Sequence, residues 1–197
     1  MQTKSSVVKL LLLLLFSPML FSQIALADKA IFAAGCFWCI ESDFEKVEGV
    51  TSVVSGYTGG SLENPSYKQV SKGGSGHYEV IQITYDPQRI SYDELLGVFW
   101  KNIDPFDAEG QFCDRGDSYR AAIFIDSEAQ RLLAETSKQK TEALLGESVV
   151  TPILNASVFY PAEDYHQDYA QKNPLRYNYY RWRCGRDQRL EEVWQLD

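Results

Sequence analysis

Strand-like and helix-like segments alternate along this chain, and their order limits the folds open to it. Runs rich in apolar and β-branched residues, typical of strands, occupy residues 29–34, 51–57, 77–85 and 119–125. Helical patterns separate the first strand from the second and the third from the fourth. The order β-α-β-β-α-β is that of a ferredoxin-like split βαβ sandwich. We therefore predict an α+β, two-layer sandwich with C-terminal extensions.

Turn and cap residues support these elements. The first helix is expected at about residues 39–48. Ser91 and Glu94 form a capping box, the residue pairing that begins many helices. A cap at Ser127 begins another helix, and residues 149–154 predict a fifth strand.

The first 27 residues have the pattern of an export signal. Two lysines precede an unbroken apolar run at residues 10–16, and Ala25-Leu26-Ala27 has the A-x-A form of a signal-peptidase site. A proline and several polar residues interrupt the stretch, which makes it a poor membrane anchor. We expect cleavage before Asp28, contact with a membrane only during export, and one mature domain at residues 28–197. The protein would then work in an oxidising compartment, the periplasm.

The charge balance argues against two classes of partner. The chain has 19 basic and 27 acidic residues, a formal net charge of −8. Nucleic acids and anionic lipids are bound through basic patches, so we expect neither. The chain has two histidines and one Cys-x-x-Cys pair without a second pair, which argues against a metal site. We expect a monomer.

The segment Gly35-Cys36-Phe37-Trp38-Cys39 carries the strongest chemical signal. It joins a strand to a helix, so Cys36 falls at a helix N-terminus, where free backbone N–H groups and the helix dipole favour a thiolate. A structural disulfide is the alternative, and export makes it a serious one. A four-residue loop constrains the unfolded chain little, however, and the flanking aromatic residues suit a substrate pocket. We interpret Cys36 as a nucleophile.

Five motifs occur in an order that resembles a known enzyme family. They are Gly35-Cys36-Phe37-Trp38, Gly56-Tyr57-Thr58-Gly59-Gly60, Gly76-His77-Tyr78-Glu79-Val80, Asp114-Arg115-Gly116-Asp117-Ser118-Tyr119-Arg120 and Ala162-Glu163-Asp164-Tyr165-His166-Gln167. Over residues 28–197 the chain resembles peptide methionine sulfoxide reductase A. It departs from the common pattern at Tyr78, where the family has Ala, at Ser118 and Ala121, where it has Gln and Ser, and at Cys39, where many members have Gly.

The resemblance implies a thiol-dependent reduction of methionine S-sulfoxide, free or in proteins, without a cofactor. By that resemblance, Cys36 attacks the sulfoxide sulfur, and Phe37 and Trp38 hold the methyl group. The sulfenic acid left on Cys36 would be converted by a nearby thiol to a disulfide, which a thioredoxin-like dithiol reduces.

The remaining catalytic roles implied by the resemblance concern the sulfoxide oxygen. Glu79 would donate a proton to it, Tyr57 and Tyr119 would hydrogen-bond it, and Asp114 would order the site. A carboxyl group that donates a proton must be neutral, which requires burial in an apolar site. Strand periodicity alone favours a different interpretation, in which Glu79 faces solvent.

Three cysteines are candidates to resolve the sulfenic acid. Cys39 is our first choice because it lies one helical turn from Cys36, at a Cβ separation of about 5–6 Å. Cys184 comes second, on a tail that could fold over the site, and Cys113 third, beside Asp114.

Two other functions remain open from the residues alone. A thiol–disulfide oxidoreductase would use Cys36 and Cys39 directly, but the strand order differs from that of thioredoxin and Glu79 would have no task. A disulfide-stapled binding module would have no activity. Assays of sulfoxide reduction and of insulin reduction separate these functions.

Overall fold

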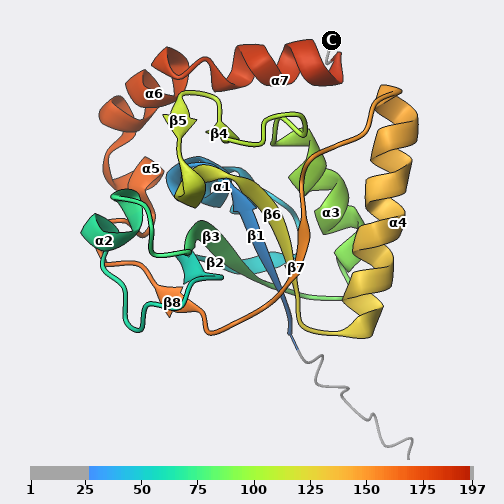
Figure 1. Cartoon of the computed structure of the whole chain (residues 1–197), viewed down its shortest axis with the longest axis horizontal. Coiled ribbons are helices and arrows are strands. Elements are labelled where there is room, and N and C mark those ends of the chain that lie inside the picture. The colour runs from blue at the N-terminus through green and yellow to red at the C-terminus, as the bar shows by residue number, and fades with distance from the viewer. Residues whose placement is uncertain (1–26, 196–197) are drawn as a thin grey trace, which may run out of the picture.

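A six-stranded sheet with helices packed around it forms the frame of the molecule (Figure 1). The computed structural model describes residues 27–195. In the order β7-β6-β1-β3-β2-β8, the strands are Ile153–Asn155, Ala121–Ile125, Asp28–Ala34, Tyr78–Tyr85, Val50–Thr58 and Tyr160–Pro161. The pairs are antiparallel except β6 with β7, which is parallel. A separate hairpin consists of β4 (Gly110–Gln111) and β5 (Asp114–Arg115), followed by a 3₁₀ turn, η1 (Asp117–Tyr119).

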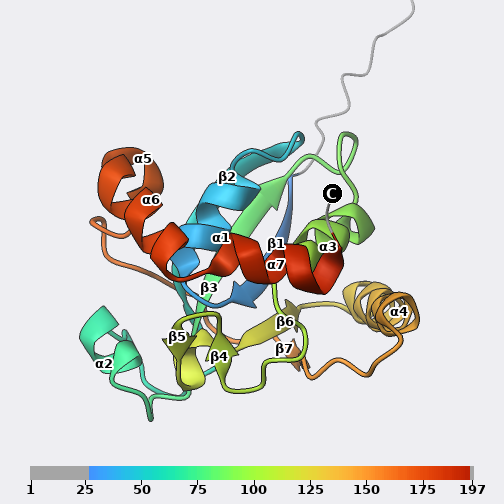
Figure 2. The same ribbon diagram turned by 90° about the horizontal axis from the view of Figure 1, so that it is seen from above.

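The helices lie around this sheet, and several of them pack against one another. Their bounds are α1 Phe37–Phe44, α2 Tyr67–Ser71, α3 Tyr92–Lys101, α4 Glu128–Leu145, α5 Tyr169–Lys172, α6 Pro174–Arg183 and α7 Arg186–Trp194. Helices α3 and α4 pack side by side, and α7 runs across the molecule from α6 towards α3 (Figure 2). Within residues 27–195, no helix is long and apolar enough to cross a membrane.

The observed elements confirm the α+β class, and the elements β1, α1, β2, β3, α3 and β6 follow one another in the expected order. The narrower ferredoxin-like assignment stays a prediction. The signal peptide and its cleavage site lie almost entirely outside the described residues.

Three predicted elements had wrong boundaries. Helix α1 begins at Phe37 and ends at Phe44, not at residues 39 and 48. Strand β6 begins at Ala121, because residues 117–119 form the η1 turn. The fifth strand is β7, shifted to Ile153–Asn155, where it pairs with β6.

The main hydrophobic core lies between the sheet and helices α1 and α3. Phe32 of β1 is fully buried there, and its ring centre lies 5.7 Å from Phe44 of α1 and 5.0 Å from Phe99 of α3. A smaller cluster, which includes Val80 and Phe124, covers the opposite face. The central strand β3 is therefore buried on both faces, and its residues at 79, 81 and 83 all face the main core.

Gly35 allows the sharp turn from β1 into α1. Its φ is +81°, a left-handed conformation that costs other residues free energy, and an added Cβ would lie 2.6 Å from Gln111 Cβ. Gln111 is itself fixed, since its amide group bonds the backbone N–H and C=O of Asp104. The turn places Cys36 directly before the first turn of α1.

We predict that Gly35→Ala lowers the free energy of unfolding by about 1–3 kcal/mol, because it adds both backbone strain and a steric clash. The control is Gly97→Ala in α3, where a Cβ meets no atom within 4 Å. That variant should be slightly more stable, by about 0.5–1 kcal/mol, since alanine favours a helix interior. Denaturant unfolding measures both; equal stability of the two variants would contradict the prediction.

Candidate active site

Cys36 lies at the N-terminus of α1 and is almost completely buried, with 6% of its surface exposed. The sequence favours a thiolate at this helix N-terminus, whereas burial opposes one. Burial raises the pKa of the Cys36 thiol, and the nearby charges of Glu79 and Asp114 raise it further. A hydrogen bond from Cys36 lowers the pKa of the Cys39 thiol. The two free cysteines therefore form a contact pair one helical turn apart.

Glu79 faces the first turn of α1 from β3. The backbone N–H of Phe37 donates to its Oε2 at 3.1 Å, while Oε1 has no hydrogen-bond partner among the described residues. The side chain is 1% exposed, so the predicted alternative of a solvent-facing residue is wrong. Burial raises the pKa of Glu79 to about 8. At neutral pH the group is a carboxylic acid with a free oxygen.

The two tyrosines named by the sequence lie near this carboxyl group. Tyr57 of β2 sits directly opposite Glu79 in the β2–β3 register, and its hydroxyl donates to Glu163 Oε2 at 2.9 Å. Tyr119 comes from η1. Burial raises the pKa of both phenols, and the charge of Glu79 adds to each shift. Both remain protonated hydrogen-bond donors at neutral pH.

Asp114 in β5 approaches the same region from the hairpin. The hydroxyl of Tyr180 in α6 donates to its Oδ2. Burial raises the pKa of Asp114. Its charge in turn raises the pKa of Cys36 and of Glu79.

The aromatic residues Phe37 and Trp38 are held by groups that the sequence did not single out. The indole N–H of Trp38 donates to His166 Nδ1 at 3.0 Å, and its ring stacks on Tyr169 at 3.7 Å. The ring centres of Phe37 and His166 are 4.9 Å apart. Burial lowers the pKa of His166, so it is a neutral acceptor with its proton on Nε2. The motif at residues 162–167 pointed to this region but not to its task.

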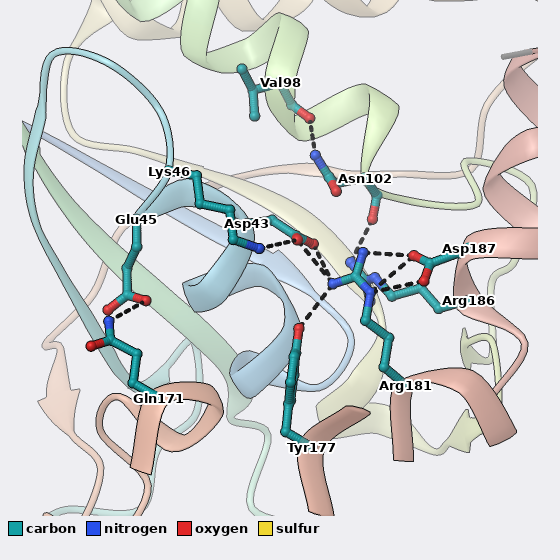
Figure 3. Close-up of polar contacts among 10 residues, drawn as sticks. All are labelled: Asp43, Glu45, Lys46, Val98, Asn102, Gln171, Tyr177, Arg181, Arg186 and Asp187. Carbon is teal, nitrogen blue, oxygen red and sulfur yellow. Dashed lines mark hydrogen bonds and ion pairs between the residues drawn. The ribbon is translucent and has the colours of Figure 1, made fainter. Parts of the chain in front are cut away.

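A network of arginines fixes α6 and α7 over α1 (Figure 3). Arg181 of α6 binds both carboxylate oxygens of Asp43 at 2.9 Å and also the carboxylate of Asp187. Arg186 is 1% exposed and donates to the backbone C=O of Asn102 at 2.7 Å and of Ala34 at 3.3 Å. These contacts hold the C-terminal helices against the site.

The third and fourth cysteines form a disulfide, Cys113–Cys184, across 71 residues of sequence. Cys113 is exposed, Cys184 is half-buried, and both adjoin Asp114. Ligand atoms of these three residues lie within 4.8 Å of one another, but the two sulfurs are bonded to each other. The structure thus brings the residues predicted for the site to one region. The four cysteines form two pairs there: an inner pair, Cys36 and Cys39, and an outer pair, Cys113 and Cys184.

Fold and site together define a thiol-based oxidoreductase, and comparison with known proteins gives its family. The model of the family "Peptide methionine sulfoxide reductase" matches residues 28–197. Peptide methionine sulfoxide reductase MsrA 2 of Rhizobium meliloti is 52% identical over 165 residues, 84% of this chain and 82% of the relative. MsrA of Bacillus subtilis is 49% identical over 167 residues, 84% and 94% of the two chains. Mxr1 of Saccharomyces cerevisiae in its reduced form has a TM-score of 0.72 and 31% identity, over 75% of this chain and 86% of that one.

The chain belongs to the peptide methionine sulfoxide reductase family. It is an oxidoreductase that reduces methionine sulfoxide at the expense of thiols. The predicted family is confirmed, and the two other functions that the residues left open are set aside.

Burial of Glu79 predicts a specific pH dependence of stability. Between about pH 4.5 and 8 the folded protein holds a proton on Glu79 that the unfolded chain has lost, so stability falls as pH rises. Glu79→Gln stays neutral and should raise the free energy of unfolding at pH 8 by more than about 1 kcal/mol relative to the unchanged protein. Near pH 4 the difference should vanish.

Urea unfolding between pH 4 and 9 measures this effect. The Glu79→Gln variant should keep part of the pH dependence, because burial also raises the pKa of Glu41 to about 7. Glu63→Gln, at an exposed position, is the matched control and should unfold as the unchanged protein does. A Glu79→Gln variant that is less stable at pH 8 would contradict the assignment of a buried neutral carboxyl.

Proposed function

We propose that this enzyme reduces the S epimer of methionine sulfoxide, free or in proteins, with Cys36 as nucleophile and Glu79 as proton donor. The observation that carries the proposal is the state of Glu79. Its carboxyl group is buried, has a pKa of about 8, and keeps one oxygen without a protein partner next to the nucleophile. A neutral acid in this position suits the polar oxygen of a sulfoxide.

Reduction of the sulfoxide at Cys36 needs no reactant other than the substrate and the enzyme. Glu79 transfers its proton to the sulfoxide oxygen while Cys36 Sγ bonds to the sulfur and the Cys36 thiol proton returns to the carboxyl group. The hydroxyl group then passes from the substrate sulfur to Cys36 Sγ: the substrate sulfur–oxygen bond and the new sulfur–sulfur bond break, and a Cys36 sulfur–oxygen bond forms. Methionine leaves, and Cys36 remains as a sulfenic acid. Tyr57 and Tyr119, as protonated phenols, stabilise the charge that develops on the oxygen.

Phe37 and Trp38 provide the apolar surface for the methyl group. Their ring centres lie 6.4 Å apart. His166 and Tyr169 fix the orientation of Trp38, which would limit how the sulfoxide can enter. We therefore assign substrate positioning to Phe37 and Trp38.

We predict that Cys36→Ser abolishes sulfoxide reduction and that Glu79→Gln slows it by about 10²–10⁴-fold, as expected for loss of a general acid. In the unchanged protein the rate should fall as pH rises above about 8, because Glu79 then loses its proton. Trp38→Ala should chiefly raise KM. The assay uses a methionine sulfoxide peptide with dithiothreitol, and Glu63→Gln is the control. Full activity of Glu79→Gln at neutral pH would show that Glu79 is not the proton donor.

The enzyme is then recycled through its cysteines. Cys39 condenses with the Cys36 sulfenic acid, releasing water and forming the inner disulfide. The outer pair reduces this bridge by exchange, which leaves the Cys113–Cys184 disulfide found in the structure. A thioredoxin-like dithiol reduces the outer bridge. The enzyme works as a monomer and without a bound metal or cofactor.

The order of the cysteines is testable in a single turnover without reductant. We predict that Cys39→Ser accumulates sulfenic acid on Cys36, because the nearest thiol is missing. Disulfide mapping and counting of free thiols in each Cys→Ser variant give the result. A Cys36–Cys184 bridge in the unchanged protein, together with normal recycling of Cys39→Ser, would reverse the order.

We also propose that the protein is exported and cleaved before Asp28, which places the enzyme in the periplasm. The A-x-A pattern at residues 25–27 supports this, as do the start of β1 and of the family match at residue 28. Intact-mass measurement of the mature protein should show Asp28 as its first residue. Protein that retains residues 1–27 after export would contradict cleavage.

A further inference from the structure

The two sulfurs of the outer disulfide lie in different surroundings. Cys113 occupies the exposed turn between β4 and β5. Cys184 caps the C-terminus of α6 and is half-buried, on the same side of the helix as Tyr180 four residues earlier. A protein reductant reaches an exposed sulfur more readily than a half-buried one, because exchange needs its attacking sulfur in line with the bond that breaks.

Cys184 Sγ also has two polar neighbours. The backbone N–H of Cys113 donates to it at 3.1 Å, and Asp114 Oδ2 lies 3.8 Å away. The N–H group would stabilise negative charge on this sulfur once the bridge opens. In the disulfide, Cys184 Sγ carries no proton. Once the bridge opens, the Asp114 carboxyl group can give a proton to this sulfur or accept one from it.

The charged and titratable groups around Asp114 come from several elements. Tyr180 of α6 donates a hydrogen bond to Oδ2, and Arg186 of α7 lowers the pKa of Asp114 through its charge. The charge of Asp114 in turn raises the pKa of Glu79 of β3 and of Cys36. Burial nevertheless raises the pKa of Asp114 above that of an exposed carboxyl, and so closer to that of a thiol.

We propose that exchange at the outer disulfide has a built-in direction: the reductant attacks Cys113, Cys184 leaves, and Asp114 is the acid–base group for Cys184. This inference rests on the recycling scheme proposed above. It gives Asp114 a second task besides ordering the sulfoxide site, and it gives Tyr180 the task of positioning Asp114.

Reduction of the outer disulfide takes place in two steps. A thiolate of the reductant bonds to Cys113 Sγ, the Cys113–Cys184 bond breaks, and its electron pair goes to Cys184, which takes the proton of Asp114. The second thiol of the reductant then attacks the reductant sulfur of the mixed disulfide and releases Cys113, which takes the proton of that thiol. The reductant therefore leaves as a disulfide, oxidised by two electrons. When Cys184 next attacks the inner bridge, the Asp114 carboxylate accepts its proton.

The first test maps the sulfur that is attacked. Protein oxidised with diamide holds the outer bridge whether or not turnover forms it, so failure of the recycling scheme would not hide the result. The bridge is opened briefly with glutathione, free thiols are blocked with N-ethylmaleimide, and the peptides are analysed by mass spectrometry. We expect glutathione on Cys113 and the maleimide on Cys184. Glutathione mainly on Cys184 would overturn the proposed direction.

The second test measures how fast glutathione opens the bridge, with no sulfoxide present. Asp114→Asn should slow opening by about tenfold or more, because the leaving sulfur loses its proton donor. Asp117→Asn, an exposed acid three residues away, is the matched control and should open at the unchanged rate. Tyr180→Phe removes the hydrogen bond from the Tyr180 hydroxyl to Asp114 but keeps the carboxyl group. This variant should therefore retain more of the rate than Asp114→Asn. Equal losses in Tyr180→Phe and Asp114→Asn would assign Asp114 a structural role only.

Discussion

The hydrogen bond from the Phe37 backbone N–H to Glu79 Oε2 joins the two parts of the active site. It links the first turn of α1, directly after Cys36, to the central strand β3. Burying a carboxyl group in an apolar core is costly unless it is neutral or well bonded, and here a single N–H satisfies one oxygen only. The group therefore stays protonated, and its second oxygen remains available. The same burial that costs stability at high pH keeps Glu79 protonated for the role of proton donor that we propose.

The C-terminal helices depend on a second set of polar contacts. Arg181 and Arg186 each bind groups from elements far apart in sequence, including Asp43 of α1 and the C=O of Ala34 at the end of β1. They thereby hold Tyr180 and Cys184 beside Asp114. The guanidinium group of Arg186 also lies over the Phe112 ring, 4.5 Å from its centre, so this anchoring combines hydrogen bonds with a cation–π contact.

The spatial order of the cysteines fits the recycling scheme that we propose, in which electrons pass from the outer pair to the inner pair. The inner pair is buried where the sulfoxide reacts, and the outer pair has one sulfur at the surface. Separating the two tasks lets the catalytic cysteine stay shielded from water and from unselective oxidation, since oxidation follows exposure. Asp114 Oδ2 lies 3.8 Å from Cys184 Sγ of the outer pair, and its charge raises the pKa of Cys36 in the inner pair.

The sequence by itself determined which residues we propose for the reaction, the α+β class and most of the positions of helices and strands. Alternation, caps and glycines are local signals, so the Ser91 cap of α3 and the turn at Gly35 were readable from neighbouring residues alone. The side that Glu79 faces was not readable. Because β3 is buried on both faces, the alternation that would mark an outward residue is lost, and only packing against α1 shows which side chain turns inward. The same limit applies to Cys113–Cys184, to the His166 contact with Trp38 and to the raised pKa of Cys36. Each depends on groups brought together from distant parts of the chain, and the free energy of burial at such a site is decided only when the tertiary structure excludes water.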